Sequence, residues 1–105
     1  MENISIDELH RRIDNLNDQQ LILDVRSAEE FNEGHIAGAQ NTPHEEVGSI
    51  VEDLKKFETV YVHCKMGGRA KMASQILSSS GLDNIVCVGD GGMQRWNEMG
   101  WSIES

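Results

Sequence analysis

The sequence predicts an α/β domain with a small, mainly parallel sheet and helices on both faces. Short apolar runs suited to buried strands, at residues 21–25, 59–63 and 84–88, alternate with segments of helical periodicity. Strands that are apolar on both faces and are separated by helices are typical of parallel sheets. With 105 residues, of which 38% are hydrophobic, we expect one domain spanning residues 1–105 around one core.

Two helices in the N-terminal part of the chain are predicted from capping boxes. Ser5 precedes Glu8 at the spacing of this motif, and Ser27 precedes Glu30 in the same way. In a capping box the serine side chain accepts a hydrogen bond from the backbone, and the glutamate reaches back to the serine N–H. We therefore expect a helix after each serine, and the second helix should stop near Gly34.

The middle of the chain should add a short strand, a helix and a strongly predicted strand. Residues 38–43 look like a strand that runs into a turn. Residues 47–57 are predicted to be a helix, because apolar residues recur along one stripe. These residues are Val47, Ile50, Val51 and Leu54. Residues 59–63 are β-branched, aromatic or polar in a pattern that favours a strand.

The C-terminal part should contain two more helices on either side of the strand at residues 84–88. The first is predicted over residues 69–80 and should be ended by Gly81. The second should begin at Gly91 or Gly92 and close at Gly100. The residues expected to face inward are Ala73, Ile76 and Leu77 in the first helix, and Met93 and Trp96 in the second.

The charge balance argues against two classes of partner. Nine basic and 18 acidic residues give a net charge of −9, and an acidic body repels nucleic acids and anionic membranes. No apolar run approaches the roughly 20 residues that a membrane-spanning helix needs. The N-terminus shows no basic segment followed by an apolar stretch, so no signal peptide is visible and the expected location is the cytoplasm.

The two cysteines, Cys64 and Cys87, lie in different surroundings. Cys87 sits inside an apolar run, where a small buried side chain is expected. Cys64 follows the strand at residues 59–63 and opens a glycine-rich, cationic segment, which is where a reactive thiol would be placed. Ligand sites in parallel sheets lie beyond the carboxyl ends of the strands, which is the position of Cys64.

The loop that begins at Cys64 has the properties of an anion cradle. It reads Cys64, Lys65, Met66, Gly67, Gly68 and Arg69. Adjacent glycines let successive N–H groups point inward, and the following helix adds its positive end, so the thiolate of Cys64 should be favoured. Lys65 and Arg69 add positive charge suited to a small anionic donor. Met66 either lines the rim or contacts the substrate. His63 is expected to be a strand-end residue with a satisfied ring rather than a catalytic base.

Three segments together resemble the rhodanese domain family, in particular its single-domain sulfurtransferases. The first runs from Asp24-Val25-Arg26 through Glu30-Phe31 to residues 34–39, the second is residues 63–69, and the third is Gly91-Gly92-Met93 with Trp96. The resemblance covers nearly the whole chain, and three segments in the right order at the right spacing are highly specific.

The resemblance implies a thiosulfate sulfurtransferase, or rhodanese. Cys64 would take the outer sulfur of thiosulfate or a similar donor, sulfite would leave, and the Cys64 persulfide would pass the sulfur to cyanide or to a thiol. The cellular acceptor would be a thioredoxin-like protein or a low-molecular-weight thiol. Covalent catalysis of this kind gives ping-pong kinetics. The resemblance implies no metal or organic cofactor.

Three further residues of the signatures, Asp24, Arg26 and His35, are expected to brace the loops around the site through ion pairs and hydrogen bonds. One position departs from the family pattern. Gly89-Asp90 stands where the family usually has a bulky apolar residue before the final glycine pair. Asp90 would either place a negative charge near the pocket or point to solvent.

Two other functions fit parts of the same pattern. A phosphatase or arsenate reductase on this fold would use five residues between cysteine and arginine, whereas four separate Cys64 from Arg69, which favours sulfur over a phosphoryl group. A dedicated persulfide carrier, which relays sulfur to one basic or thioredoxin-like partner, is the stronger alternative. Steady turnover with a generic acceptor would separate an enzyme from such a carrier.

Overall fold

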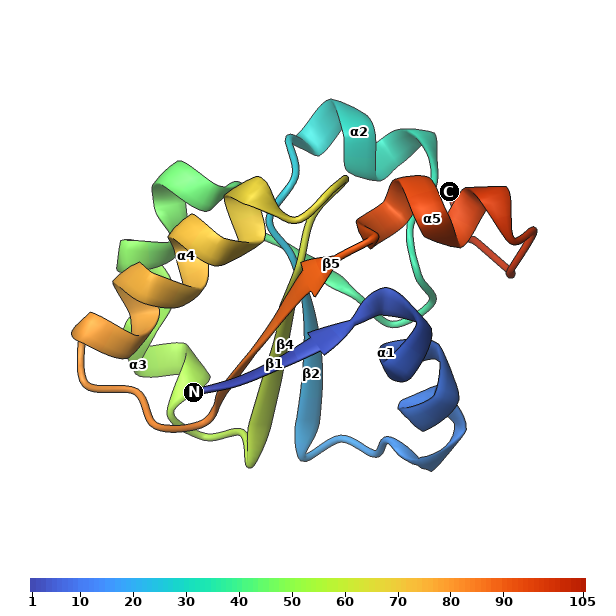
Figure 1. Cartoon of the computed structure of the whole chain (residues 1–105). Helices are drawn as coiled ribbons and strands as arrows, with labels where there is room; N and C mark the ends of the chain where they lie inside the picture. The colour runs from blue at the N-terminus through green and yellow to red at the C-terminus, as the bar shows by residue number, and fades with distance from the viewer.

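A five-stranded parallel sheet with the order β1-β5-β4-β2-β3 organises the chain (Figure 1). The computed structural model describes residues 1–105. The strands are β1 (Glu2–Ser5), β2 (Gln20–Asp24), β3 (Gln40–Asn41), β4 (Thr59–His63) and β5 (Ile85–Asp90). The helices are α1 (Ile6–Arg12), α2 (Ala28–Glu33), α3 (Val51–Leu54), α4 (Gly68–Ser79) and α5 (Gly92–Glu98), with 3-10 helices at Ile13–Asn15 and His44–Ile50.

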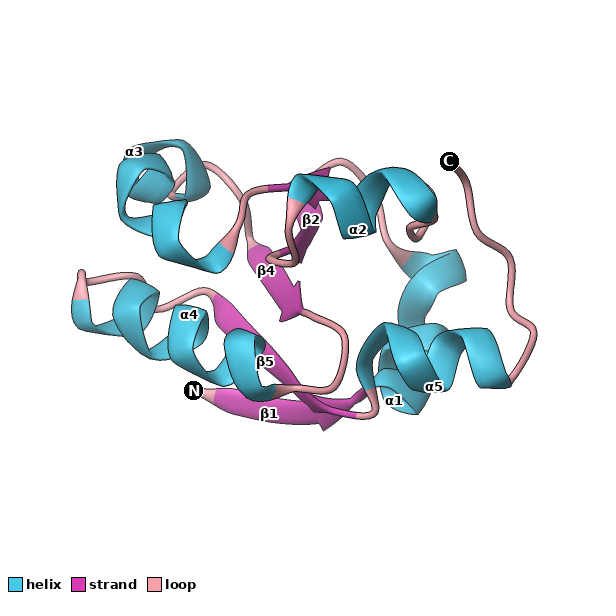
Figure 2. Cartoon of the chain, turned by 90° about the horizontal axis from the view of Figure 1, so that it is seen from above, coloured by secondary structure: helices cyan, strands magenta, loops and turns pink.

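Helices cover both faces of the sheet, as the sequence predicts. Figure 2 shows α3 and α4 on one side and α1 and α5 on the other. The α3–α4 face buries residues of β2 and β4 against α4, including Leu23, Val62 and Leu77. The opposite face packs α1 and α5 against the sheet through residues such as Leu9 and Trp96. Because both faces are buried, the central strands are apolar throughout, which explains their continuous apolar runs.

The two predicted capping boxes differ in the structure. Ser27 and Glu30 form the complete reciprocal motif at the start of α2. At the start of α1, Ser5 accepts from the Glu8 N–H at 3.1 Å, but the Glu8 carboxylate turns away to Arg11 and Arg12. The nearby arginines therefore compete successfully for the glutamate, and only half of the first predicted box forms.

Two element-level predictions need correction, and one strand was missed. The helix predicted over residues 47–57 is a 3-10 helix at His44–Ile50 followed by a single α-helical turn at Val51–Leu54. Strand β1 was not predicted, because its four residues carry no apolar run. Ile76, expected to face inward on α4, is 45% exposed, while Ala73 and Leu77 are fully buried as predicted.

The sheet brings the functional segments to one edge. Cys64 and the loop after β4, the segment after β2, and the start of α5 after β5 all follow the carboxyl ends of neighbouring strands. Helix α2 lies across this end of the molecule (Figure 1). None of the helices has the length and hydrophobicity required to span a bilayer.

Candidate active site

Cys64 lies directly after β4 at the base of the loop that leads into α4. Its side chain is 1% exposed, and its sulfur accepts hydrogen bonds from the N–H of Gly67 at 3.0 Å and of Ala70 at 3.3 Å. Gly67 is the residue before α4, and Ala70 lies in the first turn of that helix. The sulfur is therefore held at the positive end of a 12-residue helix, where an anion is stabilised.

Gly67 makes the curl of this loop possible. Its φ is +119°, a conformation that side-chain-bearing residues rarely adopt. A methyl group at this position would also overlap the backbone carbonyl oxygen of Gly89, at the end of β5. The loop can therefore turn toward the sulfur for two reasons. Gly67 tolerates the positive φ, and it has no side chain to collide with the backbone of β5 at Gly89.

The start of α5 closes the loop from the other side. The N–H of Met93 donates to the Cys64 carbonyl at 2.9 Å, and the N–H of Gln94 donates to the Lys65 carbonyl at 3.0 Å. Gly92 lies so close that a methyl group on it would overlap the Lys65 carbonyl oxygen. These contacts explain why a glycine precedes Met93, and they fix the backbone carbonyls of Cys64 and Lys65.

Arg69 is paired with Glu30 of α2. The two terminal nitrogens of the guanidinium donate to the two carboxylate oxygens at 2.6 and 3.0 Å, in a fork geometry. The Arg69 hydrogen bonds lower the pKa of Glu30 to about 2, and backbone and side-chain hydrogen bonds from Ser27 act in the same direction against partial burial. Glu30 reciprocally raises the pKa of Arg69. The charge that the sequence places at the end of the loop is therefore balanced by a fixed carboxylate.

Asp24 and Arg26 form a buried ion pair next to the loop. The closest approach is 2.7 Å between Arg26 Nη2 and Asp24 Oδ2, and the Arg26 Nε donates to both carboxylate oxygens. Arg26 also donates to the carbonyl of Gly34 at 2.8 Å, which ties the end of β2 to the end of α2. Breaking such a pair leaves an uncompensated buried charge, so these two residues stabilise the segment that carries Glu30.

His63 and His35 lie in different environments. His63 is completely buried, and both of its ring nitrogens lack a hydrogen-bond partner within the protein, so the expectation of a satisfied ring is wrong. Burial lowers the pKa of His63, although Asp24 at 3.8 Å opposes the shift, so the ring is neutral near pH 7. His35 stacks on Phe31 at 3.7 Å, and its Nδ1 lies 2.9 Å from the Phe31 carbonyl oxygen.

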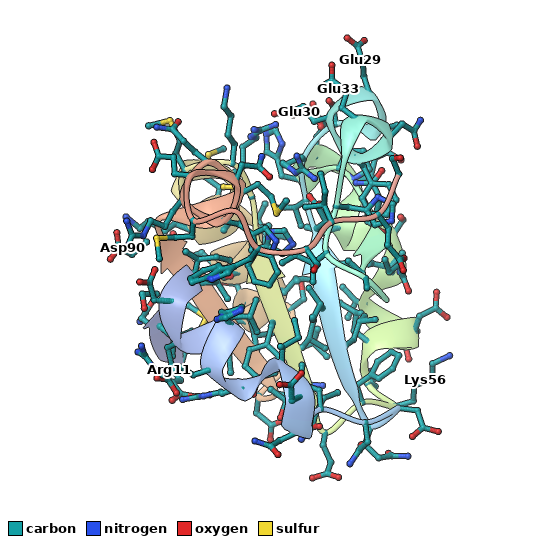
Figure 3. The ribbon with its side chains drawn as sticks, turned by 90° about the vertical axis from the view of Figure 1, so that its right-hand side faces the viewer. Arg11, Glu29, Glu30, Glu33, Lys56 and Asp90 are labelled. Atoms are coloured by element: carbon teal, nitrogen blue, oxygen red, sulfur yellow. The ribbon has the colours of Figure 1, made fainter.

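A cleft of about 420 Å³ borders the loop between α2 and α5. Its lining includes Arg26, Lys65 and the acidic residues Glu30, Glu33 and Glu98. Figure 3 shows Glu29, Glu30 and Glu33 projecting together at one end of the molecule. Met66, on the loop itself, is 64% exposed. The surroundings of the loop therefore carry more negative charge than the loop sequence alone suggests.

The departure at Gly89-Asp90 has a structural explanation. Asp90 is exposed, lines a separate hollow with Asp7 and Arg95, and lies away from the labelled glutamates (Figure 3). Gly89 is covered by the aliphatic part of Lys71, whose Cε lies 2.9 Å from where a Cβ would be. Asp90 therefore adds no charge to the cleft, and Lys71 occupies the space beside Gly89. Cys87 is buried and lies outside the loop.

These features define a class of protein: a parallel α/β domain that holds one cysteine in an anion-stabilising loop beyond its central strand. The chain belongs to the family of the rhodanese-like domain, whose family model matches residues 5–99. The fold and the family resemblance expected from the sequence are thereby confirmed.

Similar proteins carry two kinds of functional name. YrkF of Bacillus subtilis, provisionally named a sulfur carrier protein, is 32% identical over 94 residues, which are 89% of this chain and 49% of that protein. The thiosulfate sulfurtransferase GlpE of Shewanella oneidensis is 32% identical over 73% of this chain and 75% of its own. A rhodanese-like domain protein from Staphylococcus aureus, known from a crystal structure, superimposes with a TM-score of 0.83 at 31% identity and covers both chains completely. The chain thus spans about half the length of YrkF.

The pairing of Arg69 with Glu30 is the feature of the site that sequence reasoning missed. The two residues lie 39 positions apart, and each had a sufficient local interpretation, Arg69 as a rim charge and Glu30 as part of a capping box. The available signal was the excess of glutamates around Ser27. Glu29, Glu30 and Glu33 are too many for capping alone.

Proposed function

We propose that this protein is a sulfurtransferase that carries a sulfane sulfur as a persulfide on Cys64. The Cys64 thiolate attacks the outer sulfur of thiosulfate or a similar donor, and the donor S–S bond breaks with its electron pair going to the departing sulfite. In the second half-reaction an acceptor thiolate or cyanide attacks the outer sulfur of the persulfide. The Cys64 thiolate is regenerated as the sulfur leaves with the acceptor.

The hydrogen bonding of the Cys64 sulfur carries this proposal. Two backbone N–H groups already point at Sγ from the start of α4, at 3.0 and 3.3 Å, and they would stabilise either a thiolate or a persulfide anion without reorganisation. Cys87 has no such donors and is buried in the sheet. The relatives named as a sulfur carrier and as a thiosulfate sulfurtransferase are consistent with sulfur chemistry at this loop.

The size of the loop supports sulfur over phosphate as the transferred group. Gly67 donates to the sulfur and α4 starts at the next residue, so the donors surround a space close to the sulfur itself. A tetrahedral phosphoryl group needs donors around three further oxygens. The 1% exposure of Cys64 likewise favours a terminal sulfur atom as the reactant. The phosphatase interpretation therefore remains the weakest of the three.

The other loop residues have supporting roles in this proposal. Lys65 and Met66 are exposed at the rim and would contact the donor, and Gly67 and Gly68 supply backbone N–H groups at the start of α4. Arg69 would act from the end of the loop, with its charge moderated by Glu30. Asp24, Arg26 and His35 would brace the segments behind the site.

Mass spectrometry after incubation with thiosulfate tests the proposal. We expect the intact protein to gain the mass of one sulfur atom, and peptide mapping should place it on Cys64. A Cys64→Ser variant should not be labelled, while a Cys87→Ser variant should be labelled as the wild type is. Sulfur on Cys87, or unchanged labelling of the Cys64→Ser variant, would contradict the assignment.

A dedicated persulfide carrier is the second candidate, and the Arg69–Glu30 pair favours it. Because that pair balances one of the two loop cations, the site is less suited to attract a free small anion than the loop sequence suggests. Sustained turnover of thiosulfate with cyanide or a simple thiol would favour the enzyme. Stable loading without turnover, until a basic or thioredoxin-like protein is added, would favour the carrier.

A further inference from the structure

Glu30 is held at the site by more contacts than helix capping requires. Its Oε1 accepts from the backbone N–H and the hydroxyl of Ser27 at 3.0 and 3.1 Å, and both carboxylate oxygens accept from Arg69 at 2.6 and 3.0 Å. The carboxylate therefore has one orientation, fixed from its own helix and from α4. It lines the cleft that borders the loop, as does Lys65, the residue after Cys64.

The ion pair changes the charge that a donor meets. Glu30, with a pKa of about 2, stays ionised across the neutral range, so the positive charge of Arg69 is balanced there at every working pH. Arg26, the other arginine lining the cleft, is balanced in the same way by Asp24. Lys65 is the cation of the cleft that has no acidic partner within ion-pair distance, and it shares the lining with Glu33 and Glu98.

Sulfane-sulfur donors differ in charge at nearly constant shape. Thiosulfate is a dianion. Methanethiosulfonate carries the same terminal sulfur, but a methyl group replaces one oxygen and it is a monoanion. With both donors the Cys64 thiolate bonds to the terminal sulfur, the donor S–S bond breaks, and its electron pair leaves on sulfite or on methanesulfinate respectively. The leaving groups differ in intrinsic reactivity, but that difference is the same in every variant, so a change in the ratio of the two rates between variants reports the effect of donor charge.

We propose that Glu30 is a specificity-determining residue that selects against dianionic donors in favour of monoanionic ones, by pairing with Arg69. This inference rests on the proposed persulfide chemistry of Cys64. Glu30 acts through Arg69 and the field of the cleft, and its carboxylate takes no part in bond breaking. The preferred donors of this domain are accordingly monoanionic sulfane-sulfur compounds, with thiosulfate as a slower donor.

The ratio of kcat/KM for thiosulfate to kcat/KM for methanethiosulfonate tests this role. A Glu30→Gln variant keeps an oxygen acceptor for the Ser27 N–H but removes the charge, so we expect the ratio to rise about tenfold. A Lys65→Ala variant should move the ratio in the opposite direction. Taking a ratio within one protein cancels differences in folded fraction and in the intrinsic reactivity of Cys64.

Glu29→Gln is the matched control, because Glu29 lies on the same helix, is exposed, and does not line the cleft (Figure 3). Its ratio should stay within about twofold of the wild type, as expected for a solvent-screened charge outside the cleft. An unchanged or lower ratio in Glu30→Gln, or an equal rise in Glu29→Gln, would overturn the role of Glu30 and leave the proposed function intact. Failure of either donor to load the wild-type Cys64 would instead overturn the proposed function and this inference with it.

Discussion

The loop around Cys64 requires glycine at position 67. It combines a φ of +119° with contact against the Gly89 carbonyl, and its N–H is one of the two donors to the Cys64 sulfur. Any larger residue would need both a strained backbone and a displaced loop. The anion cradle therefore depends on this one position more than on the charged residues around it.

A Gly67→Ala variant should lower the free energy of unfolding by about 2–4 kcal/mol, from the sum of backbone strain and overlap. Gly68 is the matched control, because it has no positive φ and a methyl group there meets nothing within 4 Å. Gly68→Ala should leave stability unchanged or raise it by up to about 1 kcal/mol, as expected for alanine in a helix. Urea denaturation of both variants measures the difference, and equal stabilities would show that the loop relaxes freely.

At this scale the sequence predicts the position of Cys64 beyond the central strand, but not all of its neighbours. Cys64 could be singled out because its signal is local, a cysteine followed by two glycines within four residues. The unpartnered ring of His63 could not be predicted, since its burial depends on strands and helices that pack from elsewhere in the chain. The pairing of Glu30 with Arg69 joins residues 39 positions apart, and the excess of glutamates after Ser27 was its one sequence signal.

Between elements, the ion pair of Arg69 with Glu30 joins α4 to α2. Helix α2 has only six residues and no buried ones, so it contributes little apolar packing of its own. Its attachment depends on polar contacts, namely the capping box at Ser27, the Arg26 bond to Gly34, and the ion pair to Arg69. The ion pair should therefore be visible in the acid stability of the protein.

The pH dependence of stability measures this contribution. The pKa of Glu30 falls from 4.5 to about 2 on folding, so its ionised form stabilises the fold fully above pH 4.5. That stabilisation is lost as the pH falls toward 2. The difference in unfolding free energy between wild type and Glu30→Gln should therefore shrink by about 1–2 kcal/mol between pH 6 and pH 3, after discounting for solvent screening.

Chemical denaturation over this pH range provides the test, with Glu29→Gln as the comparison. Glu29 has no ionic partner, so Glu29→Gln removes a charge from the same helix without breaking an ion pair. If the unfolding free energies of Glu30→Gln and Glu29→Gln depend on pH in the same way, the Arg69–Glu30 ion pair does not stabilise the protein in solution.

Prediction of elements from the sequence succeeded where the signal is local and failed where it is not. The capping box at Ser27 lies within four residues, and it forms as predicted. Strand β1 exists because it pairs with β5, more than 80 positions away, and its own residues carry no strand pattern. The 3-10 helix at His44–Ile50 shares an apolar stripe with an α-helix, so periodicity alone does not separate the two.

For the whole molecule, the net charge of −9 sets the long-range field that a charged donor crosses before it reaches the loop. The N–H groups around Cys64 and the end of α4 attract an anion, but this attraction acts over only a few ångströms. The body of the protein acts over the Debye length, about 30 Å at 10 mM salt and about 8 Å at 150 mM. The negative body of the protein therefore repels an anionic donor as it approaches, whereas the N–H groups around Cys64 attract it once it reaches the loop.

The rate at which thiosulfate loads Cys64 should consequently rise with ionic strength, by about threefold between 10 and 150 mM NaCl, because salt screens the repulsion between an acidic body and a dianion. Methanethiosulfonate should show about half the slope in the logarithm of the rate, since the effect scales with donor charge. Quenched mass spectrometry at low donor concentration measures both slopes. A thiosulfate rate that falls with salt would mean that Lys65 and Arg69 dominate the field despite Glu30.

In Glu30→Gln the slope of the thiosulfate loading rate against salt should become shallower, because removing one carboxylate at the cleft reduces the repulsion where the donor passes closest.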